Sequence, residues 1–168
     1  MIEGFSMTRR VEPTGSLPRW LKPANRMVRL MQRLGVPLGT VRVLTVPGRA
    51  SGQPRSTPVS PLRVAGREYL IAALPRSDWA RNVRAAGRGD LSSGRGRRPV
   101  ALREVADPVI RRDVMRAFPR EVPGGVRFFV QIGLVERADP EQFAAAADRV
   151  TVFEITDVFG SNGSSGAG

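Results

Sequence analysis

The chain contains no cysteine and no histidine among its 168 residues, and these two absences exclude much catalytic chemistry. Without cysteine there is no disulfide, thiolate nucleophile, iron–sulfur cluster or cysteine-bound zinc. Without histidine there is no imidazole base, no Ser-His-Asp triad and no ordinary zinc site. If the chain is an enzyme, its chemistry must therefore come from a bound cofactor or from a carboxylate.

Long apolar segments are also missing. No run of about 18 apolar residues occurs, so no segment of the sequence is predicted to span a bilayer. The opening residues, "MIEGFSMTRR", lack the apolar stretch of a signal peptide. We therefore expect a cytoplasmic protein.

Positive charge, by contrast, is abundant. The chain has 27 basic and 15 acidic side chains, a formal net charge of +12, and Lys22 is its only lysine. Arginine suits planar, bidentate contacts with phosphate or carboxylate groups. A field of this sign attracts anionic ligands, nucleic acid or anionic lipid. A GC-rich genome would produce the same arginine bias, so composition does not choose among these explanations.

Alternation and turn residues predict a mainly antiparallel strand set with helices between the strands. Strands are expected at 40–46, 55–64, 68–74 and 150–156, with a hairpin at 89–105 whose tip lies near Gly94 and Gly96. The second strand contains Pro58 and Pro61, which argue for an edge or a bulge. The fold class is therefore α+β: a small barrel of about six mainly antiparallel strands with peripheral helices. No GxGxxG follows a first strand, which disfavours a dinucleotide-binding sheet.

Capping signals place the helices. We expect helices at 19–34, 77–87, 107–118 and 139–149. Ser77 and Gly87 bound the second helix, Asp107 caps the third, and Asp139 with Gln142 forms a possible capping box on the fourth. The predicted buried stripe of the third helix comprises Val109, Ile110, Val114 and Phe118.

The chain reads as one domain over residues 17–158, preceded by a flexible arm at 1–16 and followed by a disordered Gly/Ser tail at 159–168. The helix at 19–34 has arginines on one side and apolar residues on another. Such a helix can lie on an anionic membrane, cover an anionic ligand, or be an ordinary surface helix.

The stretch "VPGRASGQPRSTPVS", residues 46–60, combines glycines with arginines between two strands. Gly48 and Gly52 permit backbone conformations that turn successive N–H groups toward one point, a nest suited to an anion. Donors around this turn come from Arg49, Ser51, Gln53 and Arg55. A hairpin with solvated tips is the alternative interpretation.

Three fragments in order resemble the deazaflavin-dependent nitroreductase family, small split β-barrel proteins of actinobacteria: "LTVPGRASGQPRSTPVSPL", "YLIAAL" and "SDWARNVRAAG". The family pattern T-G-R-x-S-G-x-x-R-x-x-P reads P-G-R-A-S-G-Q-P-R-S-T-P here, and W-x-x-N-L reads W-A-R-N-V. The resemblance extends over about residues 17–157. Where family members often carry a loop with glycine and lysine, this chain has only "LPRSD".

The resemblance implies that the protein binds coenzyme F420 and is an F420H2-dependent oxidoreductase, which passes a hydride to an electron-poor acceptor such as a quinone or nitroaromatic. F420 carries a phosphate and several carboxylates. By this resemblance, Arg49, Ser51, Gln53 and Arg55 contact the phosphate and tail, Thr57 and Pro58 lie along the ring, and Ala72, Ala73 and Leu74 allow its close approach. Ser77, Trp79 and Asn82 close the far wall, and Arg76 replaces the family lysine, although Asp78 has the wrong sign for a phosphate. Related barrels hold FMN, which stays an alternative cofactor.

Two aromatic features have two interpretations each. Tyr69, the only tyrosine, is either a proton donor to the acceptor or a strand residue of the core. Phe128, Phe129 and Ile132 form either a lid over the acceptor or part of the core.

Two other functions compete with the reductase. One is a nucleic-acid-binding module that uses arginines 95, 97 and 98 at the hairpin tip, although aromatics are few and no docking motif occurs. The other is a carrier that holds the cofactor without turnover. The sequence leaves open a homodimer and the natural acceptor.

Overall fold

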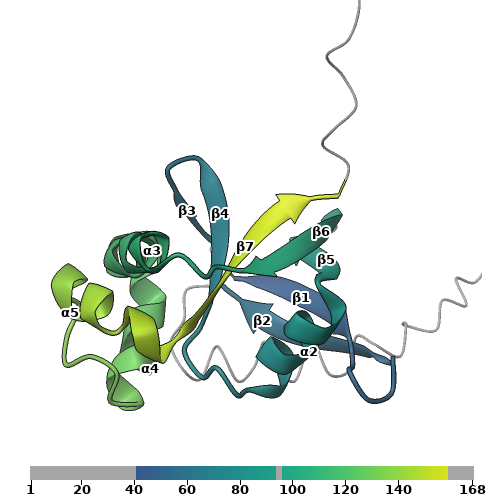
Figure 1. Ribbon diagram of the computed structural model, residues 1–168, viewed down its shortest axis with the longest axis horizontal. Coiled ribbons are helices and arrows are strands. Elements are labelled where there is room, and N and C mark those ends of the chain that lie inside the picture. Colours follow the sequence, from purple (N-terminus) through teal and green to yellow (C-terminus); the bar gives the residue numbers. More distant parts are fainter. Residues whose placement is uncertain (1–40, 94–95, 159–168) are drawn as a thin grey trace, which may run out of the picture.

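The computed structural model describes residues 41–93 and 96–158, which form one antiparallel sheet with helices around it (Figure 1). The strands are β1 (Arg42–Pro47), β2 (Pro54–Val59), β3 (Leu62–Val64), β4 (Arg67–Ala72), β5 (Arg88–Ser93), β6 (Gly96–Glu104) and β7 (Thr151–Asp157). Their order is β2-β1-β5-β6-β7-β4-β3, and all the pairings are antiparallel. The predicted arm 1–16, the helix 19–34, the hairpin tip at Gly94 and the tail 159–168 lie outside the described residues.

The connection between β2 and β3 forces this sheet to curl. These two strands stand at opposite ends of the strand order, yet only Ser60 and Pro61 join them. Such a connection spans at most about 11 Å, so the two edges must come close together. The seven described strands therefore form an open, split barrel, and the α+β fold class is confirmed. The predicted strand 55–64 divides in two here, which brings the strand count above the expected six.

Alternation along β4 separates two apolar cores. Leu70 and Ala72 pack inside the barrel with Leu44 and Phe153, whereas Tyr69 points into the second cluster. Successive strand side chains face opposite sides of a sheet, so one strand serves both cores. The inner core lies under α2 (Asp78–Ala86), which supplies Ala80 and Val83.

The second core lies where helices cover the sheet's other face. These elements are α3 (Pro108–Glu121), η1 (Pro123–Gly125), α4 (Val126–Gln131), α5 (Pro140–Ala145) and η2 (Ala147–Arg149). Figure 1 shows α3, α4 and α5 gathered at one end of the sheet, whereas α2 lies by itself beside β1 and β2. None of the helices in the described ranges is long and apolar enough to cross a membrane.

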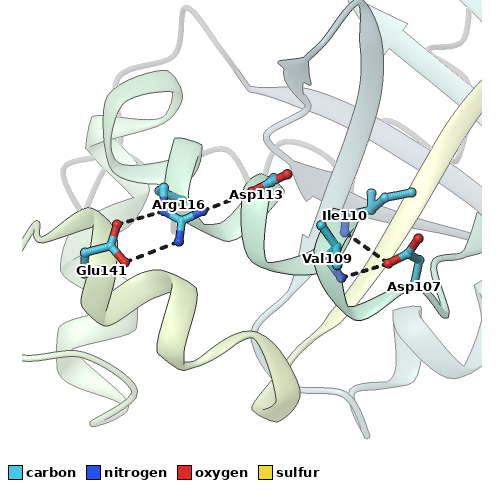
Figure 2. A network of polar contacts seen from close by, with 6 residues as sticks. All are labelled: Asp107, Val109, Ile110, Asp113, Arg116 and Glu141. Atoms are coloured by element: carbon cyan, nitrogen blue, oxygen red, sulfur yellow. Dashed lines mark hydrogen bonds and ion pairs between the residues drawn. The ribbon is translucent and has the colours of Figure 1, made fainter.

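Several predicted helix ends are confirmed. Gly87 ends α2 in the left-handed conformation, with φ 63°. The Asp107 carboxylate accepts the Val109 and Ile110 N–H groups at 2.8 and 3.4 Å and thereby caps α3 (Figure 2). Asp139 caps α5 in the same way, by accepting the Glu141 N–H.

Four helix predictions are wrong in detail. Val109 is 64% exposed, because the first turn of α3 presents it to solvent while Ile110, Val114 and Phe118 face the core. Gln142 forms no capping box, because its side-chain oxygen accepts the Glu136 N–H instead. The predicted helix 139–149 is broken into α5 and the short turn η2, whereas α3 extends past its expected end at Phe118.

An ion pair ties α3 to α5 on the surface (Figure 2). Arg116 binds both carboxylate oxygens of Glu141, at 2.8 and 3.3 Å, and also contacts Asp113. The hydrogen bond from Arg116 lowers the pKa of Glu141 below its usual value. Exposed pairs of this kind contribute little stability, so the helix cap at Asp107 is the more important polar contact.

We predict that Asp107→Ala lowers the free energy of unfolding by about 1 kcal/mol, because two N–H groups at the start of α3 lose their acceptor. Asp113→Ala is the matched control, since it removes the same charge from the same helix but only a surface contact. Urea unfolding measures both. Equal losses in the two variants would contradict the assigned role of the cap.

Candidate functional site

The β1–β2 loop closes on its own backbone. The Gly48 N–H donates to the Gln53 carbonyl at 2.8 Å, and the Gly52 N–H donates to the Gly48 carbonyl at 2.7 Å. Gly52 has φ 67°, a left-handed conformation that glycine adopts without strain. The Gln53 N–H donates to Ser51 Oγ at 3.3 Å. The N–H groups of Gly48, Gly52 and Gln53 are therefore not available to an anion, whereas no acceptor is found among the described residues for those of Ala50 and Ser51, so a nest at this turn stays a prediction.

Asn82 anchors this loop to α2. Its Oδ1 accepts two hydrogen bonds from Arg49, one from the backbone N–H and one from Nη1, both at 3.1 Å. Asn82 is only 5% exposed, so the bonds lie in a protected place. Arg49 Nη2 also lies 3.0 Å from an oxygen of Asp78. Two residues of α2 therefore hold the first arginine of the loop.

A network around Arg84 fixes the connection that leads into α2. Its guanidinium donates to the Pro75 carbonyl at 2.7 Å, to Glu104 at 2.7 Å and to Thr151 Oγ1 at 2.6 Å. These partners come from the β4–α2 connection, β6 and β7. The hydrogen bond to Glu104 raises the pKa of Arg84, which stays charged. Arg84 thus links α2 to the connection before it and to β6 and β7 of the sheet.

A polar cavity of about 530 Å³ lies between the loop, β2 and α2. Predicted site residues that line it are Arg49, Ser51, Arg55, Thr57, Trp79 and Asn82. The charge of Arg49 is opposed by Asp78, whereas Arg55 has no ion-pair partner within the described ranges. Arg55 is therefore the cation best placed to meet an anion in this cavity.

An apolar cavity of about 370 Å³ adjoins the start of α2. One wall consists of Pro58 from β2, Ala73 and Leu74 after β4, and Ser77 and Trp79 at α2. The facing wall comes from α3, η1 and α4, and includes Phe118 and Phe128. Trp79 is half-buried and lines both cavities, so its side chain borders the polar space and the apolar space.

Ser77 provides a polar atom in this apolar wall. Its Oγ is buried and has no hydrogen-bond partner among the described residues, although it stands at the cap position of α2. A buried hydroxyl normally finds a partner, because leaving it unpaired costs about 1–3 kcal/mol. An unpaired hydroxyl beside a cavity is the arrangement expected where a ligand supplies the missing hydrogen bond.

Four predicted residues line neither cavity. The side chain of Gln53 is exposed, Ala72 is buried inside the barrel, and Arg76 is exposed in the β4–α2 connection. Tyr69 is 3% exposed and packs in the core beneath α3, in accordance with the interpretation of it as a core strand residue. Burial is the main cause of the raised pKa of Tyr69.

Both phenylalanines line the apolar cavity, but they differ in how far they are buried. Phe129 is 4% exposed and packs against Phe118 and Phe143, with ring centroids 4.7 and 5.2 Å apart. Phe128 is 40% exposed and lines the apolar cavity. Ile132 is half-buried against the core and lines neither cavity.

Sequence reasoning missed the contribution of α4 and the turn before it. Gly125, Arg127 and Gln131 all line the apolar cavity. A β-carbon on Gly125 would lie 2.7 Å from Cζ of Phe118, so only glycine fits this close approach. The one available signal was the glycine pair of "PGGVRFFVQ", which marks a sharp entry into a short apolar segment.

Comparison with known proteins identifies a family for this chain. The sequence profile of the F420H2-dependent quinone reductase family matches residues 21–124, more than half of the chain. No curated protein matches the chain.

Similar solved structures include a conserved hypothetical protein from Mycobacterium tuberculosis, with 15% identity, a TM-score of 0.50, and coverage of 76% of this chain and 79% of that one. An F420-H2 dependent reductase, FDR-A, has 18% identity, a TM-score of 0.45 and coverage of 70% and 95%. A NimC/NimA family protein from Clostridium acetobutylicum has 16% identity, a TM-score of 0.48 and coverage of 78% and 82%. At 15% identity, the likeness to the M. tuberculosis protein supports the fold alone.

The family match confirms the cofactor and the class of activity that the resemblance implied. The family depends on F420H2, so coenzyme F420 is the cofactor, and the match gives no support to FMN as the alternative. The chain belongs to the F420H2-dependent quinone reductase family and is an F420H2-dependent oxidoreductase.

Proposed function

We propose that the protein reduces an electron-poor ring acceptor, such as a quinone or nitroaromatic, with the cofactor lying across the two cavities that meet at Trp79. The polar cavity takes the phosphate and acidic tail, and the apolar cavity takes the ring and the acceptor. The observation that carries this proposal is that one residue, Trp79, borders both a cavity with two arginines and an apolar cavity. F420 itself joins an anionic tail to a flat ring.

The polar cavity has suitable donors for the tail. Arg55 offers a guanidinium with no ion-pair partner in the described parts of the chain, and Ser51 and Thr57 add hydroxyl groups. Arginine binds phosphate and carboxylate oxygens in pairs of charge-assisted hydrogen bonds. Arg49 adds a second cation, which Asn82 holds in place and Asp78 partly neutralises. We infer that Arg55 makes the stronger contact with the tail.

The apolar cavity suits a flat ring. Pro58 and Ala73 present small or rigid surfaces, so a ring can approach the backbone of β2 and β4 closely. Ser77 Oγ supplies a hydrogen bond to a polar atom of the ring or of the acceptor. Trp79 separates ring from tail. The proposed site therefore keeps the predicted residues that line a cavity and leaves out Gln53, Ala72, Arg76 and Tyr69.

The chain's own contribution is positioning and exclusion of water. When bound, reduced F420 supplies a hydride, which carries two electrons to the acceptor, while water supplies the proton that completes the reduction. Apolar walls hold the reacting groups in contact and keep bulk water away from the transfer. Such a reaction needs no imidazole or thiol, and the chain has neither.

The nucleic-acid alternative loses its main support in the described residues. Arg97 pairs with Asp90, and Arg98 pairs with both Glu68 and Asp157. Carboxylates therefore oppose both of the described arginines that this alternative relies on. A cation already paired in this way gains little from a phosphate, so we retain the reductase.

We predict that the purified protein binds F420 and oxidises F420H2 when menadione or a nitroaromatic is added. Fluorescence titration with F420 beside FMN measures the cofactor preference, and absorbance measures turnover. Binding without turnover over a broad panel of acceptors would leave only a cofactor carrier. Absence of F420 binding would overturn both functions.

We also predict opposite effects for two substitutions in the polar cavity. Arg55→Gln weakens F420 affinity about tenfold, because one charge-assisted contact with the tail is lost. Asp78→Asn strengthens it severalfold at low salt, because Arg49 is then free of its carboxylate partner. The measurement is the same fluorescence titration.

Arg63→Gln on β3 is the control for both variants, since Arg63 is exposed and lines neither cavity. It removes the same charge as Arg55→Gln and should leave the affinity unchanged. If Arg63→Gln weakens binding as much as Arg55→Gln, the effect comes from the overall charge and the tail site is misplaced.

A further inference from the structure

The apolar cavity contains a single charged side chain among the residues that the structure describes. Arg127 on α4 lines it together with aliphatic, aromatic and small residues, and no carboxylate of the described chain does so. Arg127 also makes no hydrogen bond or ion pair with any residue in the described ranges. Many other arginines of the protein are paired with acidic groups, as Arg84, Arg98 and Arg116 are. Arg127 is exposed, so its guanidinium stands at the open side of the cavity with no carboxylate of the described residues beside it, where an anionic or oxygen-rich ligand would find a partner.

The two walls of the cavity come from different elements and carry different polar groups. The wall proposed for the cofactor ring comes from β2, β4 and α2, and its polar atom is the hydroxyl of Ser77. The facing wall comes from α3 and α4, and it carries Arg127 and Gln131 beside Phe128. Arg127 and Gln131 are four residues apart, so they lie on the same side of α4. A ring held on the first wall leaves the second wall to the acceptor.

The position of α4 is fixed by packing. Phe129 anchors the helix in the core between Phe118 and Phe143. Gly125, just before α4, lies so close to Phe118 that a β-carbon would approach within 2.7 Å. The backbone that carries Arg127 is therefore held at the rim of the cavity, and only the side chain is free to adapt to a ligand.

We propose that Arg127 selects acceptors that join an apolar ring to an anionic group, such as a quinone with a sulfonate or carboxylate substituent. This inference rests on the proposed function. Phe128 and Phe118 contact the ring, and the Arg127 guanidinium pairs with the anion at the rim. Arginine does not release its proton in proteins, so Arg127 binds the acceptor and takes no part in proton transfer.

Steady-state kinetics with two matched acceptors test the selectivity. Menadione and 1,4-naphthoquinone-2-sulfonate share a ring system and differ in the substituent. Arg127→Gln should lower the ratio of kcat/KM for the sulfonate to that for menadione about tenfold, mainly through KM. Intrinsic reactivity of the two quinones cancels in this comparison, since the ratio is compared between protein variants.

Arg112→Gln is the matched control. Arg112 is exposed on α3, has no ion-pair partner among the described residues and lines neither cavity, so its loss removes the same charge at another place. The ratio should stay within twofold of the wild type in this variant. An equal fall in both variants, or an unchanged ratio in Arg127→Gln, would overturn the inference.

A binding measurement separates this inference from the proposed function. Calorimetric titration with naphthalene-2-sulfonate, which cannot be reduced, should show affinity about tenfold weaker for Arg127→Gln than for wild type and for Arg112→Gln. F420 affinity should be the same in all three proteins. Loss of sulfonate binding in a protein that never binds F420 would support the subsite and contradict the reductase. Normal turnover with unchanged sulfonate binding in Arg127→Gln would support the reductase and contradict the subsite.

Discussion

Two hydrogen bonds from Arg49 to the side chain of Asn82 are the contact on which the polar part of the site depends. They join a loop between two strands to a helix that lies 33 residues further along the chain. Without this acceptor, the backbone N–H of Arg49 would lose its partner in a protected place, at a cost of about 1–3 kcal/mol, whereas the exposed guanidinium would keep Asp78. The polar cavity is the space that this contact leaves between loop, β2 and α2. The WxxN spacing is then explained in this chain, because Trp79 lines the cavities and Asn82 holds the loop.

The absence of histidine and cysteine is consistent with this architecture. The described side chains bind, orient and exclude water, and the reactive group arrives with the cofactor. The arginines also fall into two groups, those that stabilise the fold and those that line a cavity. Arg84, Arg98 and Arg116 stabilise the fold through paired contacts, whereas Arg55 and Arg127, which have no ion-pair partner in the described ranges, line the two cavities. The overall positive charge is therefore less informative than the two cations, unpaired among the described residues, that line the cavities.

Features encoded by a few neighbouring residues could be predicted from the sequence. Asp107 and Asp139 were identified as caps, Gly87 as a helix end and Gly52 as a turn residue, because each of these roles depends on local backbone geometry. The split barrel and its cofactor followed from motif order, and the family match confirms them.

Features that depend on distant contacts could not be predicted. The acceptors of four N–H groups in the β1–β2 loop lie within the loop for Gly48, Gly52 and Gln53 and on α2 for Arg49, and no sequence pattern shows this. Val109 and Gln142 were misassigned because tertiary contacts decide which side of a helix is buried and which N–H a side chain reaches. Arg127 was missed because no local pattern shows that α4 faces the ends of β2 and β4.

The central claim is that the cofactor lies across two cavities that share the indole of Trp79. The chain has two tryptophans, so Trp20→Phe leaves Trp79 as the single source of indole fluorescence. Titration of this variant with F420 is predicted to quench the Trp79 emission with the same dissociation constant as direct F420 binding. Tight F420 binding that leaves the emission of Trp79 unchanged would place the cofactor elsewhere and contradict the account.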